Sequence, residues 1–235
     1  MDEQDMTTSF EVRQIATTIH GRYLVDAAAG EGAPLLIGFH GYGENAERHL
    51  EKLQKIPGAE RWLLCAVQGL HRFYNTRTGD VLASWMTSQD RERAIVDNIR
   101  YLKAVVTEVH ERYRPGERTV VAGFSQGVAM AYRAATSGCV DPCHGLIALA
   151  GDVPPEVRSS ALPEFPPVLL GRGTADEWYS EEKMDKDLAV LADLGADVTA
   201  CVFDGGHDWT PEFYAAAGAF LARVDGLAPV GGASG

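Results

Sequence analysis

The sequence predicts an α/β fold, with one domain built on a mostly parallel sheet of about eight strands and helices on both faces. Short runs of β-branched and apolar residues alternate along the chain with longer segments of helical periodicity. The chain has 235 residues, 46% of them hydrophobic, which is enough for one well-buried core. We expect residues 1–227 to form this α/β domain and residues 228–235, which are small and without pattern, to be a disordered tail.

Eight segments are predicted as strands. The first two have little helical sequence between them, which favours an antiparallel hairpin at the start of the sheet. The later ones are separated by longer segments, as parallel strands require. In chain order, the candidates are Phe10–Ala16, Arg22–Ala27, Pro34–Phe39, Trp62–Val67, Thr119–Gly123, Gly145–Ala150, Val168–Gly171 and Val198–Phe203.

The clearest helix is predicted over Ser88–Tyr113, because apolar residues recur there at spacings of three and four and Pro115 with Gly116 stops the pattern. The segment His71–Thr87 has no clear periodicity and is expected to be a long loop. Its aromatic side chains either wall an apolar pocket or pack as ordinary buried side chains. Shorter helices are predicted over Ala46–Gln54, Gln126–Thr136, Glu181–Leu194 and Pro211–Val224.

The charge and hydropathy of the chain exclude several function classes. The net charge of −12 argues against a nucleic-acid partner, because neutralising phosphates requires a basic face. No stretch approaches the roughly 18 apolar residues of a membrane helix, so we expect no stable membrane insertion. The acidic start Met1–Asp5, with no apolar run after it, is unlike a signal peptide, so a cytoplasmic location is predicted.

The cysteines suggest a metal site only weakly. In a cytoplasmic protein they are expected to be reduced thiols. Cys139, Cys143 and His144 lie close together in the sequence, but Pro142 interrupts them and no second ligand pair follows at a spacing typical of zinc sites. We therefore expect no metal.

The motif Gly123-Phe124-Ser125-Gln126-Gly127 lies between a predicted strand and a predicted helix. A serine hydroxyl becomes an effective nucleophile when a sharp turn exposes it beside a base. The flanking glycines permit such a turn, because a side chain at either position would collide with the neighbouring strand or helix. This pattern predicts Ser125 as a nucleophile.

The loop Gly38–Gly43 follows the strand Pro34–Phe39 and can turn a backbone amide toward the serine. Attack on an acyl carbon places negative charge on oxygen, which preorganised N–H donors stabilise. We expect those donors to be the backbone amides of Tyr42 and Gln126. His40, within the loop, is interpreted as a histidine that braces the loop.

The same loop leaves a different enzyme class open. Gly41 and Gly43, followed by Ala46 after a strand and before a helix, match a loose dinucleotide-binding fingerprint, which would make the protein an oxidoreductase. That fingerprint requires an acidic residue at the end of the next strand, where this chain has Gln68 and Gly69.

The other parts of a catalytic triad are expected in loops after later strands, in the order serine, acid, histidine. Asp176 follows the predicted strand Val168–Gly171, and His207 follows the predicted strand Val198–Phe203. Because the carboxyl ends of parallel strands share one edge of the sheet, both loops should converge on Ser125.

With these motifs, the chain resembles the phospholipase/carboxylesterase family of α/β-hydrolases, which includes the acyl-protein thioesterases. The resemblance spans Pro34 to Val224 and implies an α/β-hydrolase fold, hydrolysis of carboxylic esters or thioesters, no cofactor, and often a homodimer. Members usually carry glycine where this chain has Val128, and a valine–proline pair near the positions of Trp178 and Tyr179. These departures bear on which substrate is cleaved more than on the hydrolytic chemistry.

The predicted function is that of a serine hydrolase that cleaves small to medium acyl groups from esters or thioesters through an acyl-enzyme. Ser125 attacks, His207 takes and returns the proton, and Asp176 orients the imidazole. A catalytically inactive ligand-binding member of the fold is the alternative outside catalysis. The expected substrate contacts are Phe73, Trp85 and Trp178.

Overall fold

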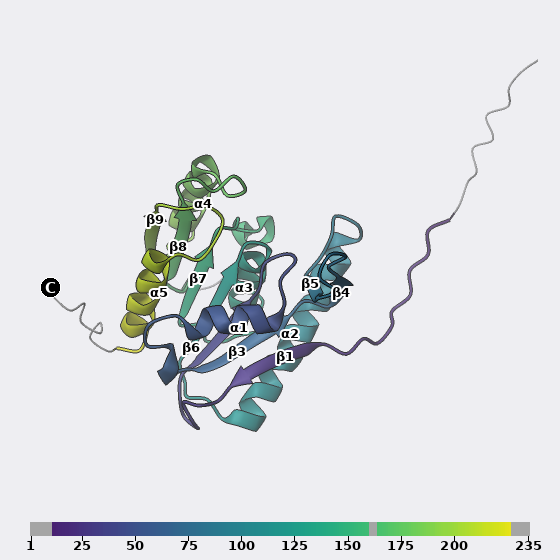
Figure 1. The fold of residues 1–235 in the computed structure, drawn as a ribbon, viewed down its shortest axis with the longest axis horizontal. Coiled ribbons are helices and arrows are strands. Elements are labelled where there is room, and N and C mark those ends of the chain that lie inside the picture. Colours follow the sequence, from purple (N-terminus) through teal and green to yellow (C-terminus); the bar gives the residue numbers. More distant parts are fainter. Residues whose placement is uncertain (1–10, 160–163, 227–235) are drawn as a thin grey trace, which may run out of the picture.

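A computed structural model describes residues 11–159 and 164–226 of the chain (Figure 1). Its main sheet has seven strands in the order β1-β3-β2-β6-β7-β8-β9. Only β1 runs antiparallel to its neighbour, so the sheet is mostly parallel, as predicted. The strands are β1 (Arg22–Asp26), β2 (Leu35–Phe39), β3 (Leu63–Gln68), β6 (Thr119–Phe124), β7 (Gly145–Leu149), β8 (Val168–Gly173) and β9 (Val198–Phe203).

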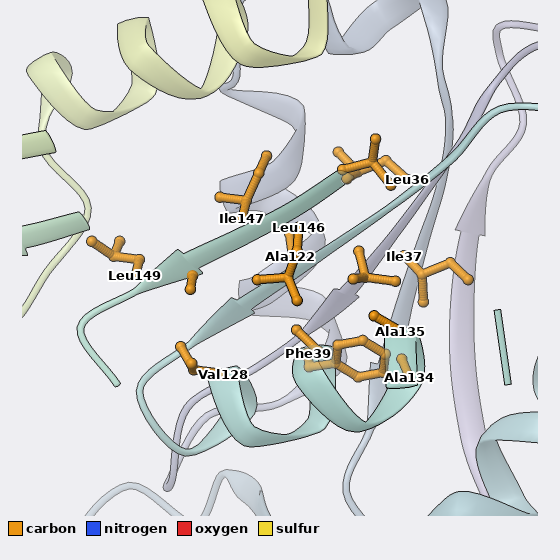
Figure 2. Packing of buried hydrophobic residues seen from close by; sticks show 14 of the residues in the cluster. Leu36, Ile37, Phe39, Ala122, Val128, Ala134, Ala135, Leu146, Ile147 and Leu149 are labelled. Atoms are coloured by element: carbon orange, nitrogen blue, oxygen red, sulfur yellow. The ribbon is translucent and has the colours of Figure 1, made fainter. Parts of the chain in front are cut away.

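Helices follow the strands and cover the sheet on both faces. In Figure 2, α3 and the yellow α5 lie on opposite faces of the sheet, with buried residues of β2, β6 and β7 between them. All side chains of these three strands are buried, as expected for parallel strands covered on both sides. The α-helices are α1 (Ala46–Gln54), α2 (Arg91–Tyr113), α3 (Gln126–Thr136), α4 (Glu181–Asp193) and α5 (Pro211–Val224), and short 3₁₀ helices cover Ala59–Arg61 and Pro155–Ser159.

Helix starts coincide with side-chain caps in three cases. Asn45 accepts a hydrogen bond from the backbone N–H of Arg48 at the start of α1, and Ser180 and Thr210 do the same for α4 and α5. Such caps satisfy N–H groups that have no partner inside the helix. They explain why α1, α4 and α5 begin at the predicted residues.

The predicted strand Phe10–Ala16 is wrong. Residues 11–16 have no regular structure and are exposed, while Phe10 lies outside the described residues. The predicted opening hairpin is therefore also wrong, because Arg22–Asp26 pairs antiparallel with β3 instead. The predicted tail, 228–235, lies outside the described residues.

The predicted long loop His71–Thr87 contains a hairpin. His71–Tyr74 (β4) and Val81–Ser84 (β5) pair antiparallel as a separate two-stranded sheet beside the main one (Figure 1). Loop contacts tie this hairpin to the segment before α1, since Gly43 N–H donates to Ala83 O and Ala83 N–H donates to Glu44 O. The hairpin is thus attached to the loop that follows β2.

Candidate active site

Ser125 lies in a strained turn between β6 and α3. Its φ of 53° and ψ of −120° are unusual for a residue with a side chain. A Cβ atom on Gly123 would lie 2.5 Å from Gly127 O, and one on Gly127 would lie 2.1 Å from Phe39 O. Both distances are far below van der Waals contact, so the interpretation that this turn requires the two glycines is confirmed.

His207 and Asp176 are hydrogen-bonded at the carboxyl end of the sheet. His207 Nδ1 lies 2.9 Å from Asp176 Oδ2 and 3.0 Å from Oδ1. Asp176 Oδ1 also accepts the backbone N–H groups of Trp178 and Tyr179, at 2.8 and 2.9 Å. The Asp176 side chain is fully buried, and such a carboxylate requires this set of donors. The imidazole is thereby held in one orientation.

The imidazole of His207 also lies close to the serine turn. The rings of His207 and Phe124, the residue before Ser125, have centroids 5.1 Å apart. Ser125 and His207 line the same cavity, of about 390 Å³. The structure therefore brings together Ser125, His207 and Asp176 from the ends of three strands.

The neighbouring carboxylates have other partners. Asp208 Oδ1 accepts the backbone N–H of Trp209 at 2.7 Å and lies 3.9 Å from Lys52 Nζ. Asp204 accepts the Thr174 hydroxyl at 3.4 Å. Asp176 is thus the carboxylate that contacts the His207 imidazole.

The loop after β2 packs against Ser125. A Cβ atom on Gly41 would lie 3.3 Å from Ser125 Cβ, so a side chain there would crowd the serine. Gly41 and Gly43 donate their backbone N–H groups to Glu44 Oε2 and Ala83 O. By contrast, no residue of the described chain accepts the backbone N–H of Tyr42 or of Gln126. These two N–H groups therefore remain available to a ligand.

His40 braces this loop from inside. The ring is fully buried, its Nε2 accepts the backbone N–H of Gly69 at 2.9 Å, and its Nδ1 lies 2.7 Å from Gly41 O. Because Nε2 is an acceptor, the proton is on Nδ1, which donates to Gly41 O. Burial lowers the pKa of His40 and favours this neutral form. These contacts agree with the bracing role inferred from the sequence.

The three residues expected to contact the substrate lie in different environments. Trp178 lines the cavity of Ser125 and is 73% exposed. The expectation for Trp85 is wrong, since its side chain is fully buried and its indole N–H donates to His40 O at 2.9 Å. Phe73 is not among the residues that line the cavity, and it stacks on the ring of Tyr42 with centroids 5.5 Å apart.

The side chain of Gln126 has a structural role that the sequence analysis missed. Its Oε1 accepts the backbone N–H of Trp85 at 2.9 Å and the Ser84 hydroxyl at 3.2 Å, and its Nε2 donates to Met86 O at 2.9 Å. These bonds fasten the segment after β5 to the start of α3. No sequence pattern indicates them, because the partners are about 40 residues apart.

The cysteine–histidine segment contains no arrangement of metal ligands. Cys139 Sγ contacts Ser137, Cys143 Sγ contacts Gly145 O, and His144 Nδ1 accepts the backbone N–H of Thr119. Across residues 11–159 and 164–226, no three His, Cys, Asp or Glu side chains are grouped so that they could hold a metal ion. Over the same residues, no helix combines the length and the apolar character needed to cross a bilayer.

A family model described as phospholipase/carboxylesterase matches residues 20–224. The chain belongs to this family. The phospholipase/carboxylesterase assignment confirms the resemblance and the α/β-hydrolase fold predicted from the motifs, and it identifies the protein as a hydrolase. It does not support the dinucleotide-binding alternative.

Solved structures of esterases share the fold. The carboxylesterase of Bacillus cereus matches with a TM-score of 0.70 and 18% identity over 87% of this chain and 94% of its own. Acyl-protein thioesterase 2 of Zea mays matches with a TM-score of 0.69 and 18% identity over 87% of this chain and 100% of its own. Esterase PE8 matches with a TM-score of 0.68 and 24% identity over 87% of this chain and 98% of its own. A comparison with curated proteins found no significant match.

Proposed function

We propose that this member of the phospholipase/carboxylesterase family is a serine hydrolase that cleaves esters or thioesters of small to medium acyl groups. The observation that carries the proposal is the hydrogen bond between His207 Nδ1 and the buried Asp176, on an imidazole that shares a cavity with Ser125. Nδ1 is engaged by the carboxylate, so Nε2 is the ring atom that can exchange a proton with the serine.

The proposed reaction has two acyl-transfer steps. Ser125 Oγ attacks the carbonyl carbon while His207 Nε2 takes the serine proton. The backbone N–H groups of Tyr42 and Gln126 stabilise the oxyanion. When the carbon–oxygen or carbon–sulfur bond to the leaving group breaks, His207 returns the proton to the leaving alcohol or thiol. Water then attacks the acyl-Ser125 ester, gives a proton to His207, and releases the acid as Ser125 regains its proton.

The size of the cavity supports a limited acyl length. About 390 Å³ lies near the lower end of the range for small-molecule pockets, roughly 300–1,000 Å³. A larger cavity, of about 630 Å³, lies beside the start of β6, and none of Ser125, Asp176 and His207 lines it. We therefore expect faster turnover of butyryl than of palmitoyl esters below the micelle concentration. The reverse order would contradict this part of the proposal.

The decisive experiment is covalent labelling with a fluorophosphonate probe. The wild-type protein should be labelled at Ser125 and should hydrolyse p-nitrophenyl butyrate, while Ser125→Ala should do neither. Ser88→Ala, which changes an exposed serine outside the cavity, is the matched control and should be labelled like the wild type. Stoichiometric labelling of Ser125→Ala would show that the nucleophile is misassigned. A wild type without labelling or hydrolysis would favour the inactive ligand-binding alternative.

A further inference from the structure

Two basic side chains line the cavity of Ser125 and His207. Arg91 is the first residue of α2, and Lys183 lies in the first turn of α4, so the topology brings them together from distant parts of the chain. The chain as a whole has a net charge of −12. Two cations at one small cavity of so acidic a protein indicate that the cavity accommodates negative charge.

Arg91 is only loosely paired. Among the described residues, its nearest carboxylate oxygen is Glu156 Oε2. This oxygen lies 3.7 Å from Arg91 Nη2, which is beyond hydrogen-bond distance. The other oxygen of Glu156 accepts Arg133 Nε at 2.6 Å and lies 2.5 Å from Arg133 Nη2. Arg133 is buried and holds the carboxylate more closely than Arg91 does. The guanidinium of Arg91, with five N–H donors, therefore retains donors that can bind a ligand.

Lys183, the second basic residue at the cavity, is positioned by one strong contact. Its Nζ donates to Trp178 O at 2.8 Å and lies 3.5 Å from Asp152 Oδ2. An ammonium group has three donors, so the backbone contact positions the charge and leaves capacity for a further acceptor. Val153 and Pro154 also line the cavity and give it an apolar part.

The acidic groups at the cavity restrict the kind of anion. Asp152 lines the cavity beside Lys183, and Asp176, behind His207, is buried and already accepts three N–H groups. A doubly charged phosphate would face more repulsion from these carboxylates than a singly charged carboxylate would. A guanidinium also matches the planar geometry of a carboxylate.

We propose that the substrate of this enzyme carries a carboxylate in addition to the ester or thioester that is cleaved, and that Arg91 and Lys183 bind this carboxylate. The inference rests on the proposed function, because it places the reactive carbonyl at Ser125. Arg91 and Lys183 are then the residues that determine specificity for half-esters of dicarboxylic acids over neutral esters of equal length.

The test compares monoethyl adipate with ethyl hexanoate, which has the same acyl length but no carboxylate. For the wild type, kcat/KM measured by ethanol release should be at least tenfold higher for monoethyl adipate, mainly through a lower KM. In Arg91→Gln and in Lys183→Gln this ratio should fall severalfold, and in the double variant it should approach one. Arg93→Gln and Lys186→Gln, exposed neighbours on the same two helices, should keep the wild-type ratio.

Binding to Ser125→Ala, measured by calorimetry, separates this inference from the proposed function. Tighter binding of monoethyl adipate than of ethyl hexanoate, lost when Arg91 and Lys183 are also replaced by Gln, would support carboxylate recognition even if the wild type hydrolysed neither ester. Hydrolysis of both esters with a ratio near one would overturn the inference and leave the proposed function intact. A wild-type ratio that persists in the Arg91 and Lys183 variants would overturn it as well.

Discussion

Glu44 accepts a hydrogen bond from the backbone N–H of Gly41, at 3.0 Å, through one carboxylate oxygen. The other oxygen lies 2.5 Å from Lys52 Nζ, in an ion pair whose side chains are only 16% and 18% exposed. The ammonium of Lys52 in turn lies 4.4 Å from the centroid of Phe124, next to Ser125. This chain of contacts fixes the loop that supplies the proposed Tyr42 N–H donor relative to Ser125.

We expect Glu44→Ala to lower kcat for p-nitrophenyl butyrate by about tenfold, less than the roughly hundredfold or more that loss of an oxyanion donor itself costs. The reason is that Gly41 loses its acceptor and the peptide before Tyr42 is less well positioned. Glu44→Gln keeps an acceptor for Gly41 and should recover most of kcat. Glu47→Ala, an exposed acid on the neighbouring helix turn, is the control. An equal loss of kcat in Glu44→Ala and Glu44→Gln would show that the charge of Glu44, rather than its hydrogen bond to Gly41, matters.

Asp176→Asn should reduce turnover far more than Asp208→Asn. An amide at position 176 cannot favour the Nδ1–H tautomer of His207 as a carboxylate does, and the comparable change in a serine protease costs about ten-thousand-fold. Asp208 instead accepts the backbone N–H of Trp209 and lies near Lys52, so its loss should lower turnover by less than about fivefold. Circular dichroism should show both variants folded. Greater damage from Asp208→Asn would reassign the triad acid.

Local patterns were sufficient to predict the helices and the loops that carry Ser125, Asp176 and His207. The starts of α1 and α5 follow from caps at Asn45 and Thr210, and the serine turn follows from glycines whose replacement would cause backbone collisions. Each of these signals lies within a few residues of the feature it specifies. The order of Ser125, Asp176 and His207 along the chain also depends only on which strand each loop follows.

Long-range contacts account for what the sequence did not reveal. Trp85 was expected to contact the substrate because it is aromatic and lies in the predicted loop His71–Thr87, but it packs on Phe39 and His40, about 45 residues away. The β4–β5 hairpin is short and half-exposed, so apolar and polar residues alternate only weakly along its strands. The pairing of the two strands in the structure is what identifies it. Arg91 and Lys183 are ordinary helix residues in sequence, and only the fold places them at one cavity.

The buried carboxyl of Asp187 should make stability depend on pH. Its Oδ2 accepts the Val153 N–H at 3.0 Å and the Tyr179 hydroxyl at 2.9 Å, yet burial raises its pKa from 3.8 to about 6. The folded state therefore binds the proton more tightly than the unfolded chain. Protonation of Asp187 therefore stabilises the folded state. This stabilisation is fully present below about pH 4 and is lost as the pH rises through 6.

Asp187→Asn removes this titration, so the variant should not lose stability as the wild type does between pH 4 and 7. The melting temperature of the variant minus that of the wild type should therefore increase over this range. The change corresponds to about 1–3 kcal/mol of unfolding free energy, since one pKa unit is about 1.4 kcal/mol. Above pH 7 the difference should be constant. Asp185→Asn, an exposed acid on the same helix, should show no such trend. A difference that falls over this range would contradict the raised pKa.

Gly127→Ala should destabilise the fold because its Cβ would meet backbone rather than a movable side chain. The new methyl would lie 2.1 Å from Phe39 O and 2.6 Å from His40 O, so β2 and the loop after it would have to move away from α3. Overpacking of this kind typically costs about 1–3 kcal/mol, and a backbone collision belongs at or above the upper end. Gly206→Ala is the matched control, since its nearest neighbour would be Ala175 O at 3.9 Å. Urea denaturation should give a midpoint well below wild type for Gly127→Ala and close to wild type for Gly206→Ala. If Gly127→Ala unfolded with the wild-type midpoint, the close approach of α3 to β2 beneath Ser125 would be wrong.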